Sequence, residues 1–543
     1  MSQPRSFRAP DRLDGATAFS SDREVSGSLA VVRLLKSQRW LWRELAGQLN
    51  LDVNWGRRRD RGHWELIAVA FVVSGVLDIL PWYDSASEDL WRECGFAERP
   101  SYRTVWRRLR ELEGHPQPWV DAVGRLVQHA RRHDPRVGAH VHFDATEDET
   151  HAAAYHDCRD GEDCAVRELV DGPRGRRSPG RGRRVQRVQT SQARTDRQHV
   201  NASPPPAGDI DPQMRLEEQI VWRAGKPYKR FRQDGCWFIC RDVDAGVRAY
   251  TGPRGARRVW LGYYNQKAVD HFTGGVLVQQ VQNARRQEYD IFADTYDQTC
   301  EVIGAAPQTA IGDKGLSIAR VFERCARNGT AAIFPWRAHG LTETVRHDKL
   351  THDRHGVGRC PHCGGESEQV RFSAAYTTPR VWMRCMIGAT PDCAREYTLP
   401  CSLDWRLLVR LSRKEPLYHE LKASHESFEA VHDWHRDRYK VAADSLGNRA
   451  KVCSRAFHQL RANVACLLDW LRICHREGWL GSARRNHGQA RRRGERAGIA
   501  AAATLARARA VIGLGRLYGP KAVELGLGPA DPPSRRNRGA PSP

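Results

Sequence analysis

The sequence predicts a multidomain α/β protein, and three observations lead to this fold class. The chain has 543 residues, enough for about three or four domains at roughly 100–200 residues each. Apolar residues recur at helical spacing over residues 31–135, which predicts an N-terminal helical domain. Beyond Val137, short segments of alternating polarity appear between helical segments, a pattern typical of a mixed sheet covered by helices.

The charge of the chain indicates a polyanionic partner. Lys and Arg number 87 and Asp and Glu number 64, giving a formal net charge of +23, and nucleic acid is the usual partner of such an excess. The first residues lack the apolar core of a secretion signal. The most apolar stretch, 66–80, is shorter than the roughly 20 residues of a membrane span. We therefore expect a cytoplasmic protein with no membrane partner.

The N-terminal part contains a candidate DNA-binding helix. Residues 1–30 show no apolar periodicity and are expected to be disordered. Segment 90–113 predicts a helix, a short turn capped by Ser101 and a basic helix, which is the helix-turn-helix pattern. Its inner face should hold Tyr102, Val105, Trp106, Leu109 and Leu112. Its basic side should contact DNA through Arg103, Arg107, Arg108 and Arg110. The alternative is an ordinary amphipathic helix with a solvated basic face.

Residues 137–337 are predicted to form the first part of a sheet-bearing core. The pattern predicts a strand at 139–147, a hairpin of 257–264 and 276–281, a helix at 288–303, a strand at 308–312, a helix at 318–328 and a strand at 331–334. Within this range, 172–207 holds nine Arg and is predicted to be a flexible basic loop.

The C-terminal part is predicted to complete the core and to end in a tail. Residues 403–480 should supply helices at about 416–439 and 454–475. Residues 481–543 carry 13 Lys or Arg against 3 acids, which predicts a basic, partly helical and partly disordered tail.

Three carboxylates stand where a metal site could form. Asp144 is expected at the end of the first strand, Asp313 follows a buried strand, and Glu429 lies in a predicted helix. Acids at buried strand ends need compensation by a cation or by hydrogen bonds. Together the three would make an oxygen-rich pocket for Mg²⁺ or Mn²⁺, which suits in-line phosphoryl transfer. Taken singly, each acid could instead be a local cap. Glu426 is an alternative third acid, and Glu147 or Asp148 an alternative first one.

The cysteines are scattered along the chain except in one place, within residues 338–402. Cys360 and Cys363 form a tight Cys-x-x-Cys turn, and Cys385 and Cys393 follow after a strand-like interval. Four thiolates predict a closed, tetrahedral structural zinc site in a ribbon-like insertion. Cys401, His355 and His362 are further candidate ligands, and coincidental buried thiols are the alternative. The odd total of 15 cysteines argues against a disulfide framework.

The order of these motifs resembles the DDE-type insertion-sequence transposases, in particular an actinobacterial-like group with a zinc-binding insertion. The resemblance spans roughly Gly138 to Ile473 and rests on a strand-borne Asp, a second Asp followed by KGLSI, and a helix with Glu-x-Val. It implies a ribonuclease H-like catalytic core in which Asp144, Asp313 and Glu429 bind Mg²⁺ or Mn²⁺. It also implies phosphate binding by Arg436, or by Lys440 as the next candidate.

The resemblance further implies DNA cleavage and strand transfer at the terminal inverted repeats of a mobile element. The partners would be those repeats and the target DNA, with a homo-oligomer on the synapsed ends in a bacterial, nucleoid-associated location. Two alternatives stay open. One is a non-catalytic, zinc-containing DNA-binding regulator, such as a domesticated or inactive transposase. The other is a structure-specific nuclease that cuts but does not join.

Overall fold

The fold is described from a computed structural model of the chain. The described residues are 23–49, 63–76, 78–149, 154–157, 218–233, 236–251, 257–335, 346–347, 350–352, 358–394, 396–406, 408–428, 431, 435, 438–439 and 454–480. The basic loop 172–207 and the tail 481–543 lie outside them. So do Glu429, Arg436 and Lys440.

Seven helices form the N-terminal part of the described chain: α1 (Arg23–Ser37), α2 (Arg39–Gln48), α3 (Trp64–Ser74), α4 (Ile79–Ser85), α5 (Glu88–Glu93), α6 (Tyr102–Leu112) and α7 (Gln117–His133). Helix α3 is apolar on all sides and almost wholly buried, because α1, α4 and α6 pack around it. It ends at Gly75, whose φ of 67° is the left-handed conformation that glycine adopts readily. The predicted apolar stretch 66–80 is therefore two helices with a break between them.

The first helix begins earlier than the sequence predicts. Helix α1 starts at Arg23, inside the range 1–30 that we expected to be disordered. The C-terminal half of this helix is anchored by tertiary contacts. Lys36 donates hydrogen bonds to Glu93, and the side chains of Val32 and Leu35 are buried. Tertiary packing thus extends a segment whose own periodicity is weak.

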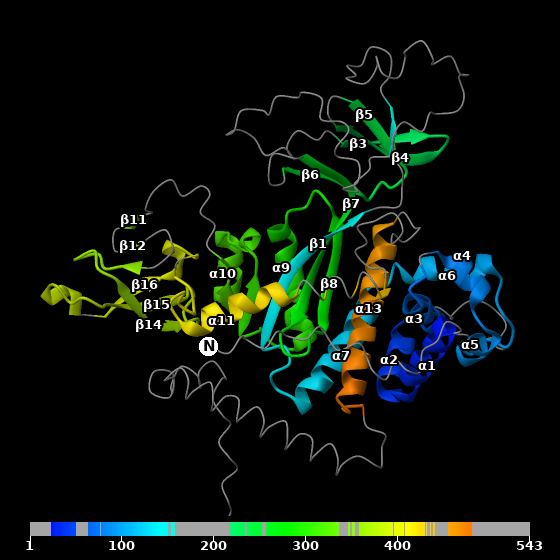
Figure 1. Cartoon of the computed structure of the whole chain (residues 1–543), viewed down its shortest axis with the longest axis horizontal. Coiled ribbons are helices and arrows are strands. Elements are labelled where there is room, and N and C mark those ends of the chain that lie inside the picture. Colours follow the sequence, from blue (N-terminus) through cyan, green and yellow to red (C-terminus); the bar gives the residue numbers. More distant parts are fainter. Residues whose placement is uncertain are drawn as a thin grey trace, which may run out of the picture. The chain divides into compact units, whose positions relative to one another are not determined.

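A six-stranded mixed sheet forms the centre of the chain (Figure 1). Its strands are β1 (His140–Glu149), β6 (Gly246–Thr251), β7 (Arg257–Asp270), β8 (Val276–Asn283), β9 (Thr309–Gly312) and β10 (Ala331–Ile333). The order is β10-β9-β1-β7, and then β6 and β8 pair with successive parts of β7. Strands β1, β7 and β8 are antiparallel neighbours, whereas β9 and β10 run parallel to β1. The α/β fold class and the predicted hairpin are confirmed.

Helices cover both faces of this sheet. Helix α9 (Glu288–Ile303) packs on one face, where Phe143 of β1 contacts Phe292 and Tyr296. Helix α10 (Ala319–Arg327) joins β9 to β10. On the other face, α13 (Arg455–Arg476) lies along β8, and Trp470 donates a hydrogen bond to the Val276 carbonyl. Successive residues of β1 therefore point alternately to α9 and away from it.

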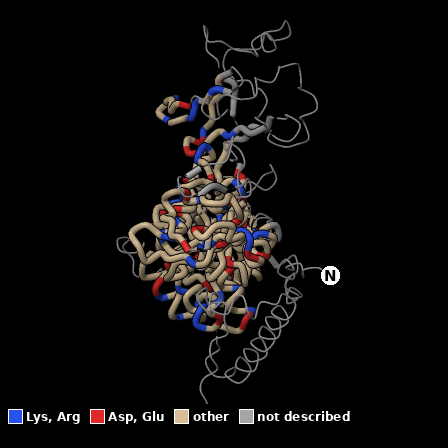
Figure 2. Tube along the Cα trace, turned by 90° about the vertical axis from the view of Figure 1, so that its left-hand side faces the viewer, with Lys and Arg blue, Asp and Glu red and all other residues tan. Residues whose placement is uncertain are grey.

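A second sheet occupies a region for which we predicted only the basic loop. Strands β2 (Ala154–His156), β3 (Glu218–Arg223), β4 (Lys226–Gln233) and β5 (Cys236–Cys240) form an antiparallel sheet in the order β2-β5-β4-β3. Basic and acidic residues are interspersed along the described trace (Figure 2). Much of the positive excess lies outside it, since 172–207 carries nine Arg against one Asp and 481–543 carries 13 Lys or Arg against 3 acids.

A segment made mostly of short strands lies between β10 and helix α11 (Pro416–Ser424) in the chain. Strands β14 (Ser367–Ser373), β15 (Arg380–Cys385) and β16 (Tyr397–Pro400) form one antiparallel sheet. The short strands β11 (Arg346–His347), β12 (Leu350–His352) and β13 (Gly358–Arg359) form another. The two sheets coincide with the predicted insertion 338–402. Within the described part of the chain, no single helix meets the length and apolarity of a membrane span, although α3 and α4 do so as a pair bent by 99°.

Candidate functional site

Asp144 and Asp313 are neighbours on the central sheet. Strands β1 and β9 are parallel, and their last paired residues are Phe143 and Gly312. The next residue on each strand is an aspartate, Asp144 and Asp313. The predicted meeting of these two acids therefore follows from the sheet register. We expected Asp144 at the end of its strand, and this prediction is wrong. Strand β1 continues past Asp144, antiparallel to β7, as far as Glu149. What ends at this level is β9.

The turn that follows β9 holds the Asp313 carboxylate. Asp313 caps the short 3-10 helix η5 (Lys314–Leu316), and its Oδ1 accepts a hydrogen bond from the Gly315 N–H at 2.5 Å. Burial raises the pKa of Asp313, and the nearby Asp144 raises it further, while the Gly315 hydrogen bond and His425 act in the opposite direction. Partial burial beside a second carboxylate is the electrostatic situation that a divalent cation relieves.

Glu288 is a third carboxylate at this place, and no sequence motif points to it. It is the first residue of α9 and is only 9% exposed. Burial raises its pKa well above the usual range, and Asp313 and Asp144 raise it further, so it lies within electrostatic reach of both. In sequence Glu288 only marks a helix start. Its place beside the two aspartates depends on how α9 crosses the sheet, which sequence spacing does not give.

Buried histidines lie on the opposite face of β1 from α9. His142 Nε2 is 2.9 Å from His271 Nδ1, and His142 Nδ1 is 3.2 Å from His425 Nδ1. The Phe428 ring stacks on His142 at 3.6 Å between centroids. Burial lowers the pKa of His142 well below its usual range, so this group is neutral near pH 7. The stack fixes the 3-10 helix η8 (His425–Phe428) beside β1, two residues from Asp144.

The remaining predicted acids and basic residues are not seen at the acidic site. Glu429, Arg436 and Lys440 lie outside the described residues. The alternative first ligand Asp148 is buried and lies 3.1 Å from His458 Nδ1 on α13, which gives it a structural partner.

The four predicted zinc ligands come together. The sulfur atoms of Cys360, Cys363, Cys385 and Cys393 all lie within 4.8 Å of one another. Cys360 and Cys393 Sγ are 3.7 Å apart, and Cys363 and Cys385 Sγ are 3.5 Å apart. A tetrahedral zinc ion with Zn–S bonds of about 2.3 Å places its sulfurs roughly 3.8 Å apart. The four-cysteine cluster therefore has the donors and the spacing to hold a metal ion such as zinc.

Tight turns present these thiols. Gly364 has a φ of 68° and donates its N–H to the Cys360 carbonyl at 2.9 Å, while the Gly365 N–H points to Cys363 Sγ at 3.4 Å. On the other side, the Gly388 N–H lies 3.4 Å from Cys385 Sγ, and this contact lowers the pKa of the Cys385 thiol to about 7. Backbone donors aimed at sulfur stabilise thiolates, which are the form that binds metal.

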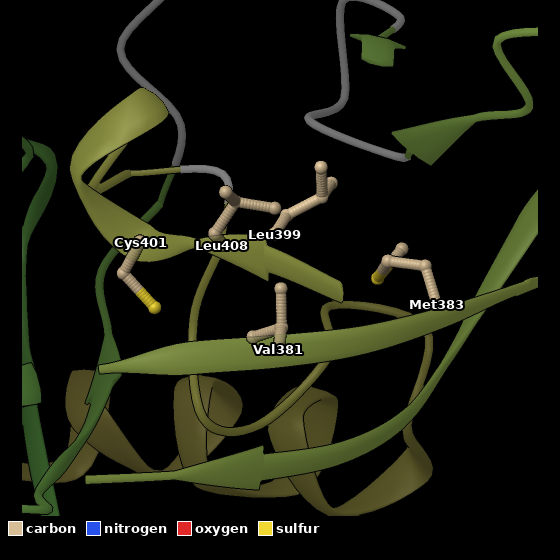
Figure 3. Packing of buried hydrophobic residues seen from close by; sticks show 5 residues of the cluster. All are labelled: Val381, Met383, Leu399, Cys401 and Leu408. Carbon is tan, nitrogen blue, oxygen red and sulfur yellow. The ribbon is translucent and has the colours of Figure 1, made fainter. Parts of the chain in front are cut away.

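The two spare ligand candidates that the structure describes, Cys401 and His362, do not join the cluster. Cys401 is packed instead among apolar side chains of the neighbouring sheet, namely Val381, Met383, Leu399 and Leu408 (Figure 3). Burial raises the pKa of its thiol to about 12, which suits a core residue. His362 is exposed, and His355 lies outside the described residues.

Helix α6 is the predicted DNA-contacting helix, and its faces differ from the prediction. The Ser101 side chain accepts a hydrogen bond from the Thr104 N–H, so the predicted cap is confirmed. Arg108, however, is only 7% exposed, whereas Trp106 is 45% exposed. The buried positions are Val105, Arg108, Leu109 and Leu112, which follow the i, i+3, i+4, i+7 spacing.

The four candidate arginines therefore have different environments. Arg108 Nη1 donates to Glu111 Oε2 at 2.7 Å, and its guanidinium lies 5.9 Å from the Trp64 ring centroid, so it is a packing residue and not an exposed contact. Arg103 and Arg107 are exposed. Arg110 is half-buried and pairs with Glu113 at 2.9 Å.

Comparison of the chain with known proteins identifies no relative. No protein-family model, curated protein or solved structure matches the chain.

Proposed function

We propose that the protein is a DDE-type DNA transposase, which cleaves DNA at the ends of a mobile element and transfers the freed strand in a reaction that depends on a divalent metal ion. The observation that carries this proposal is the adjacency of Asp144 and Asp313, each one residue beyond the last paired residues of two parallel central strands. Two carboxylates held side by side are the minimum for a shared oxygen-ligand site for Mg²⁺ or Mn²⁺.

The strand order supports a ribonuclease H-like core. An antiparallel trio, β1, β7 and β8, is followed by a helix and then by β9 and β10, which add in parallel on the free side of β1. The two aspartates thus stand on the first strand and on the strand that joins beside it. That is the arrangement that the resemblance to the transposases implies.

The segment before Glu429 supports this residue as the third acid. Phe428 stacks on His142, whose side chain lies on β1 two positions before Asp144. His425 acts electrostatically on Asp313. Since η8 therefore runs past both aspartates, Glu429 follows directly on a segment that is already at the site.

The donor set fits a divalent cation. A Cβ built on Gly315 would stand 2.6 Å from Glu288 Oε2 and 2.8 Å from Asp313 Oδ1, so only glycine fits against these two carboxylates, which lie close together. Asp144, Asp313 and Glu429 would hold the ions, and Arg436 or Lys440 would position the phosphate. When bound, the ions would activate the attacking oxygen and stabilise the leaving 3′-oxygen.

The remaining features would serve DNA engagement. The exposed Arg103 and Arg107, the loop 172–207 and the tail 481–543 supply positive charge for phosphate contacts. The four-cysteine cluster would fix the insertion through zinc. We propose a homo-oligomer on the paired terminal repeats as the working form, in the nucleoid of a bacterial cytoplasm.

Strand cleavage by the purified protein tests this proposal. The substrate is labelled DNA that carries the inverted repeats flanking the coding sequence, and it is incubated with Mg²⁺, Mn²⁺ or EDTA. We expect nicking at the repeat ends with either metal, no nicking with EDTA, and none with Asp313→Asn. Strand-transfer products would separate the transposase from a nuclease that only cuts.

A non-catalytic zinc-containing regulator is the second candidate, favoured by one observation. The four-cysteine cluster assembles from residues outside the acidic site, so DNA binding and metal-dependent folding need no catalysis. Tight binding to the repeats without nicking in either metal would favour this candidate.

A further inference from the structure

Glu288 is a buried carboxylate, and one of its two oxygens lacks a hydrogen bond from the described residues. Its residue is 9% exposed, and Oε1 has no hydrogen-bond partner among the described residues. An ionised carboxylate that leaves water in this way loses several kcal/mol of solvation unless a cation or donors replace the water. The structure therefore holds an acid whose compensation is missing.

The groups around Glu288 do not provide that compensation. Asp313 and Asp144 carry the same charge and make its ionisation harder. Arg248 acts favourably from a distance, but its Nη1 points to the carbonyls of Ala284 and Arg286 at 3.5 and 3.2 Å. The Glu288 carbonyl is engaged by Gln266 Nε2 at 3.3 Å, which fixes the start of α9 but not its carboxylate.

One oxygen of Glu288 lies close to Asp313. Its Oε2 and Asp313 Oδ1 both lie within 3 Å of the place where a Cβ on Gly315 would stand. A Cβ there would clash with both oxygens, so only glycine fits between α9 and the turn after β9. Carboxylate oxygens brought together from two elements are ligands that hard divalent cations take.

We propose that Glu288 is a direct ligand of the divalent cation held by Asp144 and Asp313, so that α9 contributes to the metal site together with β1 and β9. The inference rests on the proposed function and extends it, because the motif order assigned no acid from this helix. Glu288 would share the cation's charge with the aspartates and keep the ion at the β9 end of the site.

Mn²⁺ binding to the full chain tests the proposal without using activity. The zinc-loaded protein is titrated with Mn²⁺, and free Mn²⁺ is measured by electron paramagnetic resonance. The variants are Glu288→Gln, which keeps the shape of the side chain, and Gly315→Ala, whose methyl group would push the two carboxylate oxygens out of place. Glu301→Gln is the matched control, because Glu301 is an exposed acid near the other end of the same helix.

We expect Glu288→Gln to weaken the site at least ~10-fold, since even indirect supporting groups cost about 10–100-fold in metal affinity. Gly315→Ala should weaken it similarly, and Glu301→Gln should leave it unchanged. Far-ultraviolet circular dichroism verifies that each variant is folded. If Glu288→Gln misfolds, the response of Gly315→Ala decides.

The aspartate variants separate failure of this inference from failure of the proposed function. If Asp144→Asn and Asp313→Asn abolish the Mn²⁺ site while Glu288→Gln binds as wild type does, Glu288 is not a ligand and the proposed function stands. If no Mn²⁺ site depends on either aspartate, the metal-dependent function itself is overturned, and the inference with it.

Discussion

Asp144 and Asp313 stand at the same level of two parallel strands, one residue beyond the pair Phe143 and Gly312. The register of β1 and β9 brings the two residues side by side, and the cap hydrogen bond from the Gly315 N–H holds the Asp313 carboxylate. Burial raises the pKa of Asp313, and the nearby Asp144 raises it further. The chemistry that we propose follows from this placement.

Asparagine at either aspartate should separate catalysis from DNA binding. We expect Asp144→Asn and Asp313→Asn each to lower the cleavage rate by at least ~100-fold, because losing a ligand removes the charge stabilisation of the transition state. Affinity for repeat DNA at a fixed salt concentration should change less than ~3-fold. Glu429→Gln should behave in the same way. Retained cleavage in any of the three would remove that residue from the site.

The four-cysteine cluster predicts one bound metal ion per chain. Cys360→Ser or Cys385→Ser should reduce the zinc content, measured by atomic emission, from one equivalent to near zero, and should destabilise the sheet β14–β16. Cys401→Ala is the matched control. It lies in the adjoining apolar core, so it should keep the zinc and cost about 1 kcal/mol in the free energy of unfolding. Equal zinc loss in all three variants would contradict the assignment.

Neighbouring arginines on α6 should respond oppositely to substitution. The double variant Arg103→Ala/Arg107→Ala should leave the melting temperature unchanged. It should also reduce the slope of log affinity against log salt by about 0.9 for each phosphate that the protein no longer neutralises. Arg108→Ala should instead lower the free energy of unfolding by about 1–3 kcal/mol, because it removes a buried guanidinium that packs against Trp64 and donates a hydrogen bond to Glu111. Unchanged DNA binding in the double variant would exclude this helix face from the interface.

The buried histidines predict acid sensitivity. Burial lowers the pKa of His140 to about 4, with His271 contributing, whereas an exposed histidine titrates near 6.5. Between these values the unfolded chain binds more protons, so stability is lost as the pH falls from 6.5 to 4. His140 alone should contribute about 1 kcal/mol between pH 6.5 and 5.5.

Urea denaturation at these two pH values measures the effect. His140→Gln should flatten the pH dependence of the free energy of unfolding, while the exposed His115→Gln should not. A pH dependence of His140→Gln equal to that of wild type would show that His140 does not carry this effect. His133, His142, His271 and His435, whose pKa values burial also lowers, contribute to the residual slope.

The strongly periodic segments could be predicted from the sequence. Helix α9 has the predicted bounds Glu288–Ile303, and the hairpin β7–β8, strand β9 and the Ser101 cap were also predicted. The cysteine cluster was predicted because thiol spacing in a tight turn is a local property. These features depend on neighbours in the chain, and such neighbours are visible in the sequence.

Features that depend on packing could not be predicted in the same way. Arg108 occupies a buried position of the α6 stripe, but its charge led us to place it outside and Trp106 inside. Glu288 comes within electrostatic reach of the aspartates only because α9 crosses the sheet at this place. In the sheet β2–β5, strand β2 pairs with a strand that lies beyond a long basic segment. Such a long-range pairing leaves no pattern among neighbouring residues of the sequence.

Anomalous X-ray scattering from crystals grown with Mn²⁺ tests the central claim most directly, because it locates the ion without requiring the correct DNA end. We expect a manganese peak about 2.1 Å from carboxylate oxygens of both Asp144 and Asp313, and its loss in crystals of Asp313→Asn. Ordered Asp144 and Asp313 side chains with no manganese peak between them would contradict the claim that these residues form a metal-dependent catalytic site.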